Sequence, residues 1–241
     1  MKILPNIEIV DLALYFDSTL VIADVHIGYE EALNKQGILV PRLQFEEMAQ
    51  RVERIFSLLK NNKIERIVVN GDLKHEFGTI SEQEWRNSLK FLDLLAKHCD
   101  EIILIKGNHD AIIGPIAKKR NVNVKEFFWI PSKKILIAHG NKIPNQQLLK
   151  DVSTIIIGHE HPTVSLKERP RVEQYKCFLK GKYEGKNLIV QPSFNNIVNG
   201  TDILRDEILS PFLQQNLDNF DVFIVEDKVY DFGKLRNLRN G

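Results

Sequence analysis

Five short aliphatic runs recur along the first two thirds of the chain and constrain its fold more than any other feature. The runs are apolar throughout and do not alternate with polar residues, which is typical of strands covered on both faces. Between the runs, residues 43–62 and 81–98 space their apolar side chains as amphipathic helices do. This alternation predicts an α/β fold. The runs are LVIA at 20–23, RIVV at 66–69, EIILI at 101–105, KILIA at 134–138 and TIIIG at 154–158.

From about residue 160 the pattern changes to strand-like segments separated by turn signals. The segments are KCFLKG, NLIVQP, DVFIVED and KVYDF, with EGKN between the first two. They predict a sheet built from hairpins. Because no linker rich in Gly, Ser or Pro and no internal repeat separates the two halves, we expect a single domain over residues 1–241, with a tail that frays from about residue 234.

A polar cluster follows each of the five apolar runs. In open α/β sheets ligands bind beyond the carboxyl ends of the strands, so these side chains are expected to converge on one site. Five of the seven histidines belong to the clusters. The clusters are Asp24-Val25-His26, Asn70-Gly71-Asp72, Gly107-Asn108-His109-Asp110, His139-Gly140 and Gly158-His159-Glu160-His161.

The residue types in these clusters indicate divalent metal ions. Carboxylate, amide oxygen and imidazole without thiolate suit Mn, Fe, Zn or Co, of which we take Mn as the expected metal. The donors are too many for one ion, so two are expected, with Asp72 in the middle of the set as the bridging carboxylate. Glycines at 71, 107, 140 and 158 permit the close backbone approach that a crowded site requires.

The motifs D-x-H, G-D, G-N-H-D, H-G and G-H-x-H, in this order over roughly residues 24–161, resemble those of the calcineurin-like metallophosphoesterase superfamily. The resemblance implies a four-layer fold in which two mixed β-sheets form a sandwich flanked by helices, with two cations at the strand ends. The implied ligands are Asp24, His26 and His161 for the first cation, Asn108, His139 and His159 for the second, and Asp72 as the bridge.

A finer resemblance rests on NGDLKHEFG at 70–78 and on RV and KCFLKG within 171–181. These motifs are similar to those of small prokaryotic phosphoesterases related to recombination-repair nucleases and to phosphoesterases associated with DNA ligases. Where many superfamily members have an acidic residue after GDL, this chain has Lys74-His75-Glu76. This departure bears on which substrate the chain acts on, and it does not affect the implied metal ligands.

The resemblance also implies a reaction, the hydrolysis of a P–O bond by a hydroxide that bridges the two cations. His109 binds no metal in this scheme and protonates or stabilises the leaving oxygen, while Asp110 orients it. We expect a phosphodiesterase, with nucleic acid as the leading substrate. The rival hypotheses are a small-molecule phosphodiesterase or phosphomonoesterase that acts on nucleotides, and a non-catalytic, metal-stabilised scaffold that binds DNA. Retention of His109 argues against the scaffold.

Other roles are open for three of the polar residues. Asp24 and Asp72 could each be the N-cap of a following helix. His75 could contact the substrate or cap the helix that begins near Ser81. The direction of each side chain distinguishes these alternatives.

Three further features carry weaker expectations. Glu160 is expected to face away from its two neighbouring histidines, either solvated or supporting the site. The aromatic cluster EFFW at 126–129 is expected in the core, with base stacking as the less favoured alternative. Residues 191–212, rich in Asn, Gly and Thr, are expected to shape the rim of the pocket.

The composition constrains the partners and the compartment. Because 33 Lys and Arg residues balance 32 Asp and Glu residues, no charge of the whole molecule attracts nucleic acid, and such a partner requires a local patch. Cys99 and Cys177 have no CxxC spacing, which fits a reducing compartment. No apolar run approaches the roughly 20 residues of a membrane span. We expect a cytoplasmic protein without membrane contact, and the sequence leaves its oligomeric state open.

Overall fold

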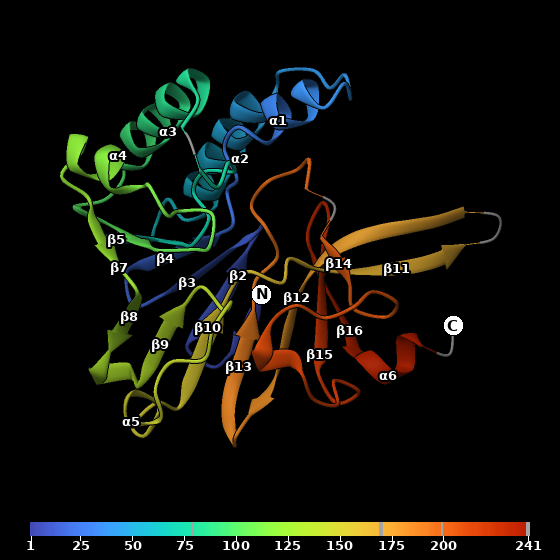
Figure 1. The fold of residues 1–241 in the computed structure, drawn as a ribbon. Helices are drawn as coiled ribbons and strands as arrows, with labels where there is room; N and C mark the ends of the chain where they lie inside the picture. Colours follow the sequence, from blue (N-terminus) through green and yellow to red (C-terminus); the bar gives the residue numbers. More distant parts are fainter. Residues whose placement is uncertain (79, 169–170, 199, 240–241) are drawn as a thin grey trace.

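The computed structural model describes residues 1–78, 80–168, 171–198 and 200–239. Two mixed β-sheets pack against each other, and the longer helices cover the outer face of the first sheet (Figure 1). The main hydrophobic core fills the space between the sheets, since side chains such as Val68 and Ile103 of the first sheet belong to one buried cluster with Ile137, Ile156 and Phe178 of the second. The predicted α/β sandwich is confirmed.

The first sheet has seven strands in sequence order. Strands β1 to β4 pair antiparallel, and β4 to β7 pair parallel. The apolar runs predicted as strands at 20–23, 66–69 and 101–105 form β4, β5 and β6, and their burial agrees with strands covered on both faces. The strands are β1 (Lys2–Leu4), β2 (Ile7–Val10), β3 (Ala13–Phe16), β4 (Thr19–Ala23), β5 (Arg66–Asn70), β6 (Glu101–Ile105) and β7 (Asn123–Lys125).

The helices of the first half connect these parallel strands. They are α1 (Tyr29–Lys35), α2 (Gln44–Leu58), α3 (Glu82–Leu95) and α4 (Gly114–Lys119). The two predicted helices correspond to α2 and α3, each ending earlier than predicted. Helix α3 begins with a capping box, in which Ser81 accepts a hydrogen bond from the Glu84 backbone and Glu84 accepts one from the Ser81 backbone. None of the described helices has the length and apolarity needed to cross a membrane.

The second sheet has nine strands and contains the predicted hairpins. Strand β12 turns into β13 at Glu184 and Gly185, whose φ values of 47° and 80° are those of the tight turn that the EGKN signal predicts. The strands are β8 (Phe127–Ile130), β9 (Ile135–Ala138), β10 (Thr154–Ile157), β11 (Pro162–Glu168), β12 (Arg171–Tyr183), β13 (Lys186–Val190), β14 (Thr201–Asp202), β15 (Asp221–Val225) and β16 (Val229–Lys234).

The outer face of the second sheet has a thinner cover than that of the first. A second buried cluster lies there, to which Leu149, Phe212 and Leu235 belong. These residues come from α5 (Gln146–Leu149), the 3-10 turn η2 (Pro211–Leu213) and α6 (Leu235–Leu238). The predicted fraying from about residue 234 is wrong for α6, because the fully buried Leu235 side chain anchors that helix. Residues 240 and 241 lie outside the described part of the chain.

The aromatic cluster at 126–129 is less buried than predicted. Phe127 exposes 38% of its surface, Phe128 and Trp129 are half-buried, and Glu126 is exposed. The reason is topological, since β8 is an edge strand of the second sheet and, among the described strands, pairs with β9 alone. The expectation that the cluster lies in the core is therefore wrong for its first half, Glu126 and Phe127.

Candidate metal centre

The predicted ligands lie in tight turns that follow β4, β5, β6, β9 and β10. Five of them have left-handed backbone φ values between 46° and 65°. This conformation is uncommon for residues other than glycine, although Asp and His adopt it more readily than most. It costs about 1–3 kcal/mol per residue, so the surrounding structure must impose it. The five residues are Asp24, His26, Asp72, His159 and His161.

Two glycines allow these turns to approach one another. A Cβ atom on Gly71 would overlap the ring of His139, and one on Gly107 would overlap the Asp72 carboxylate. Relieving the overlap at Gly71 would require the His139 ring to leave its position, and relieving that at Gly107 would require both the Asp72 carboxylate and the Asp72 backbone nitrogen to move. Close packing of the ligand turns therefore requires glycine at both positions, as predicted.

The first group of ligand atoms comes from Asp24, His26 and His161, which lie within 4.8 Å of one another. The Nε2 atoms of the two histidines are 3.3 Å apart, and Oδ1 of Asp24 is 3.4 Å from Nε2 of His161. Two nitrogens bound to one ion at about 2.0–2.1 Å with tetrahedral geometry would lie about 3.4 Å apart. The spacing therefore fits a shared cation.

The second group comes from Asp72, His139 and His159, again within 4.8 Å. Oδ1 of Asn108 is 2.9 Å from Nε2 of His139, which brings the predicted amide ligand to the same place. The structure thus assembles all seven predicted ligands in two adjacent groups. Neither Asp24 nor Asp72 is an N-cap, since α1 follows Gly28 and α3 follows Ser81.

The Asp72 carboxylate lies between the two groups. Its Oδ2 atom is 3.8 Å from Nε2 of His26 on one side and 3.4 Å from Nε2 of His139 on the other. Its Oδ1 atom accepts a hydrogen bond of 2.8 Å from the His109 backbone N–H, which fixes the plane of the carboxylate. One oxygen that faces both groups is the arrangement a bridging ligand requires.

Two buried atoms of the site lack a hydrogen-bond partner within the described residues, Oδ1 of Asp24 and Nδ1 of His139. They lie 3.5 Å apart. An unsatisfied buried polar atom costs about 1–3 kcal/mol, and more if it is charged. A divalent cation would satisfy the carboxylate oxygen, so the donor set fits a metal-binding role.

The protonation of the histidines supports the same role. Burial lowers the pKa of His159 to about 4 and holds the pKa of His26 well below its usual value, so both imidazoles are neutral at pH 7. Neutral imidazole is the form that binds metals. His139 differs: burial alone would lower its pKa, but the hydrogen bond to Asp72 and the charge of Asp24 raise it to about 9. A cation at His139 would have to displace that proton.

His109 lies beside Asp72, with 3.9 Å between Nε2 and Oδ2. Its Nδ1 atom donates to the backbone carbonyl of His75, so this carbonyl sets the ring orientation. The predicted orientation by Asp110 is wrong. The Asp110 carboxylate instead accepts backbone N–H groups of Gly107, Leu73 and Lys74 at 3.2–3.4 Å, and so braces the turn that carries His109.

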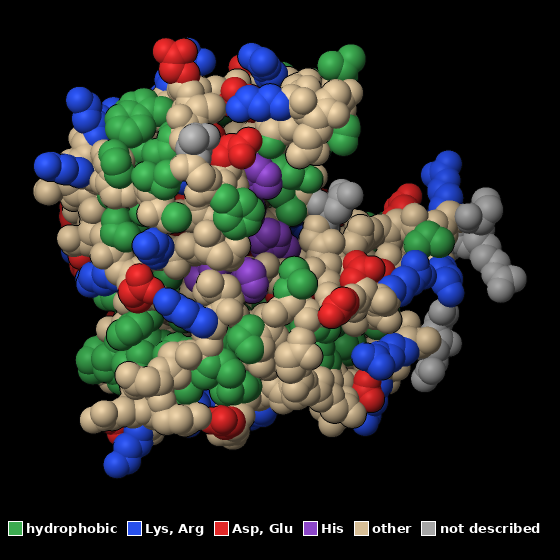
Figure 2. Space-filling model, in the orientation of Figure 1, with side chains coloured by type: hydrophobic (Ala, Val, Ile, Leu, Met, Phe, Trp, Pro, Cys, Tyr) green, Lys and Arg blue, Asp and Glu red, His purple; other side chains and the backbone are tan. Residues whose placement is uncertain are grey.

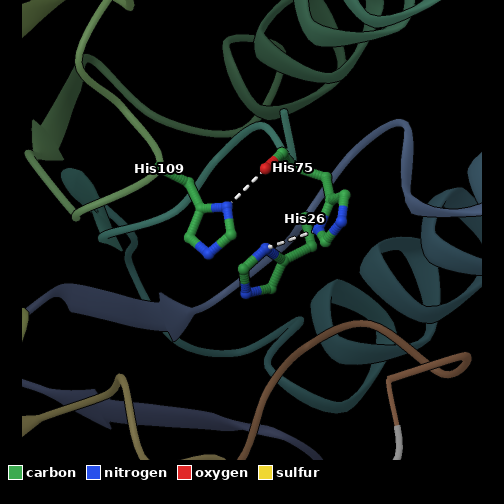
Figure 3. Close-up of side chains that lie close together, drawn as sticks. All are labelled: His26, His75 and His109. Atoms are coloured by element: carbon green, nitrogen blue, oxygen red, sulfur yellow. Dashed lines mark hydrogen bonds between the residues drawn. The ribbon is translucent and has the colours of Figure 1, made fainter. Parts of the chain in front are cut away.

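His75 lies at the same face of the site (Figure 3). Its Nδ1 atom is 3.5 Å from Nδ1 of His26, and its ring contacts those of His109 and Tyr29. The capping alternative is wrong, because Ser81 and Glu84 cap α3. The imidazole is therefore free to face the site, where its ligand atom lies within 4.8 Å of those of His26 and His109, and substrate contact stays its predicted role.

Glu160 points away from the neighbouring histidines, but it is not solvated. Its side chain is buried and accepts hydrogen bonds from the backbone N–H groups of Leu209 and Ser210, at 3.0 and 2.7 Å. Ser210 Oγ in turn donates to the Gly140 carbonyl at 2.8 Å. The carboxylate thus links the two ligand turns of the second sheet.

Residues 191–212 form hydrogen bonds to two of the turns that carry the predicted ligands. The Asn195 carboxamide donates to the carbonyl oxygens of Val25 and His26, at 3.1 and 3.2 Å. Residues 209–210 hold Glu160. The expected contribution of this segment to the pocket rim stays a prediction, and Asn199 lies outside the described residues.

Sequence reasoning missed two aromatic side chains at the site. Phe77, 56% exposed, lies against His109 with ring centroids 3.7 Å apart and the ring planes tilted by 30°, and Tyr29 packs edge-on against His75. An aromatic residue in a loop has no periodic pattern that would mark it. The only available signal was the short separation of Phe77 from His75. The histidines themselves reach the surface near the middle of one face (Figure 2).

Comparison with known proteins agrees with this geometry. The sequence profile of the calcineurin-like phosphoesterase family matches residues 18–220. The chain belongs to this family. Its members are hydrolases of phosphoester bonds that use divalent metal ions, and the two groups of ligand atoms are the corresponding candidate site in this member.

Solved structures support the fold assignment. The crystal structure of Pseudomonas putida nuclease MPE matches with 20% sequence identity and a TM-score of 0.64 over 93% of this chain and 93% of that one. A protein of unknown function from Aquifex aeolicus matches with 19% identity and a TM-score of 0.39, over 63% of this chain and 81% of that one. The fold assignment rests on the first match. No curated protein matches the chain.

Proposed function

We propose that this phosphoesterase is a phosphodiesterase that holds two divalent cations, one in each group of ligand atoms. The observation that carries the proposal is the position of the Asp72 carboxylate, whose Oδ2 atom faces both groups. The first cation would be held by Asp24, His26 and His161, and the second by Asn108, His139 and His159. Two bound cations supply Lewis acidity, which withdraws charge from phosphoryl oxygens and makes water nucleophilic at neutral pH.

His109 would act on the leaving group. Because Nδ1 donates to the His75 carbonyl, a protonated His109 would have Nε2–H free to donate to an oxygen in the site. The Nε2 atom lies 3.9 Å from Asp72 Oδ2, so it could donate to a phosphate ester bound beside Asp72. Asp110 fixes the turn beneath this histidine, so its contribution is positional.

The donor chemistry guides the choice of metal. Imidazole, carboxylate and amide donors without thiolate favour Mn, and Fe, Zn and Co are compatible with the same donors. Both cysteines are free thiols, one of them buried, and neither is near the donor set. A reducing cytoplasmic compartment suits such a chain.

Nucleic acid is the proposed substrate. The histidine side chains reach the surface, where a polymer could contact them (Figure 2). The similarity to a solved nuclease, at 20% identity, bears on the fold and not on the activity. Phosphodiester bonds of nucleic acids are the corresponding substrate class. A nucleotide-specific enzyme and a non-catalytic scaffold are the competing outcomes of the test below.

The test is hydrolysis of an aryl phosphodiester by protein loaded with Mn²⁺. His109→Ala should lower turnover by about 10²–10⁴-fold, the usual contribution of general acid catalysis, while two metal ions per chain are still bound. His98→Ala is the matched control, since that histidine stacks on Phe56 away from the site. Equal inactivity of wild type and His109→Ala would support the scaffold. Turnover of cyclic nucleotides without cleavage of DNA or RNA would support the nucleotide-specific enzyme.

A further inference from the structure

A cavity of about 260 Å³ opens beside the second group of ligand atoms. One of its walls is formed by Ala138, His139 and Gly140, the segment that carries a predicted ligand. Anything bound there lies next to the place where a phosphoryl group would be attacked. The volume is slightly below the roughly 300 Å³ at which small-molecule sites begin, which suits one planar ring system.

An aromatic ring and an aliphatic side chain lie beside this wall. Phe127 pairs in register with Ala138, so the two side chains are cross-strand neighbours on one face of the sheet. Phe127 and Ile143 both line the cavity and remain 38% and 39% exposed. The cavity therefore offers a ring face and an aliphatic side chain to a ligand within reach of His139.

The polar groups of the cavity are few and differ in charge. Lys142 is paired with the Glu126 carboxylate at 2.7 Å, so these two side chains neutralise each other. Lys106 also lines the cavity and makes no ion pair within the described part of the chain, which leaves one positive charge. The Asn141 carboxamide adds a hydrogen-bond donor and acceptor.

We infer that this cavity binds the nucleobase of the nucleotide attached to the scissile phosphate, with the base stacked on Phe127. The inference rests on the proposed function, because it names the group that the phosphodiester carries on the His139 side. A nucleotide uses all three features of the cavity: the face of its base stacks on the ring, the edge of its base bonds to Asn141, and its phosphate lies near Lys106. An aliphatic chain would leave Asn141 and Lys106 without a partner.

The test measures binding without catalysis. Protein treated with EDTA is titrated with deoxyadenosine 5′-monophosphate and with deoxyribose 5-phosphate, and the dissociation constants are determined by calorimetry or NMR. We expect the nucleotide to bind at least tenfold more tightly than the sugar phosphate. Phe127→Ala should abolish that difference, as expected when one base–aromatic stack is removed, whereas Phe127→Tyr should retain it.

Phe232→Ala is the matched control, because Phe232 has a nearly equal exposed fraction of 37% and lies on β16 outside the cavity lining. Equal affinity for the two ligands, or an unchanged preference in Phe127→Ala, would overturn the inference. Hydrolysis of the aryl phosphodiester reports separately on the proposed function. Inactive protein with Phe127-dependent nucleotide binding would refute the proposed function and support the nucleobase site. Active protein without that binding would support the proposed function and refute the nucleobase site.

Discussion

The turn that carries Asp24 and His26 is held by neutral carboxamides, whereas the turn that carries His159 and His161 is held by a carboxylate. On the first turn, Asn195 and Gln44 donate to the backbone carbonyl of His26, at 3.2 and 2.7 Å. On the second, Glu160 accepts two backbone N–H groups. The two supports therefore offer opposite hydrogen-bonding groups to the backbone.

The difference follows from the group that each turn presents to the segment that supports it. The first turn presents backbone carbonyl oxygens, and the second presents the carboxylate of its own residue Glu160. Only a donor can satisfy the carbonyl oxygens of the first turn. The second is supported through the N–H groups of Leu209 and Ser210, for which an acceptor is required. A carboxylate at the first position would repel two carbonyl oxygens, while a carboxamide at the second could still accept a hydrogen bond. Replacing the carboxamide of the first support by a carboxylate should therefore destabilise the protein more than replacing the carboxylate of the second support by a carboxamide.

The largest effect is expected for Asn195→Asp. The change removes the donor to the carbonyl oxygens of Val25 and His26 and places negative charge against them in a fully buried position. Two unsatisfied acceptors and the charge should lower the free energy of unfolding by about 3 kcal/mol or more. Urea denaturation of the metal-free protein measures this loss.

The neighbouring residue supplies the control for that variant. Asn196 lies in an exposed position and bonds to Arg51 and Glu47. Asn196→Asp makes the same chemical change in solvent, so stability should change by no more than about 0.5 kcal/mol. Similar losses in both variants would show that Asn195 owes its effect to loop charge and not to support of the first turn.

A pH-dependent effect is expected from Lys176, whose amine bonds to the Asn195 carbonyl oxygen. The amine also bonds to the carbonyl oxygen of Ser193, and burial lowers its pKa to about 7. Its pKa in the unfolded chain is about 10.4, so between these values the unfolded state binds more protons. The contribution of Lys176 to stability is therefore least favourable below pH 7 and improves as pH rises toward 10.

The measurement compares wild type with Lys176→Met. The difference in unfolding free energy between the two should change with pH by up to about 1.4 kcal/mol per unit between pH 7 and 10. Lys180→Met controls for loss of a lysine on the same strand, because Lys180 is paired with Asp221 nearer the surface. A wild-type curve parallel to that of Lys176→Met over this range would contradict a titrating buried amine.

The supports also show which parts of the site the sequence could predict. Each of the five ligand turns follows its own apolar run, so local pattern was sufficient to predict the strands and to suggest that Asp24, Asp72 and His139 converge. Asn195 contacts Val25 across 170 residues of sequence, and no local pattern marks such a pair. Adjacency was misleading for Asp110, because its carboxylate is directed back to the backbone by three N–H groups and cannot reach the ring beside it.

The same limitation applies to the fold. Strands β4, β5 and β6 are continuous apolar runs and were predictable, whereas β1, β2 and β3 are short and follow one another through turns at Pro5 and Asp11. The single-domain organisation stays a prediction, supported by the buried cluster that includes residues of both sheets.

The smallest effect is expected for Glu160→Gln, the counterpart of the change at Asn195. The carboxamide oxygen of Gln can still accept from Ser210 N–H, so the loss is limited to one weaker bond and the charge assistance, about 1 kcal/mol. Unfolding by urea should show this difference, and Glu207→Gln, at an exposed position in the same segment, should show almost none. A loss of stability as large as that of Asn195→Asp would mean that the charge of Glu160, and not its capacity to accept hydrogen bonds, holds the second turn. The contrast between the two supports would then not be one of hydrogen-bond donor against acceptor.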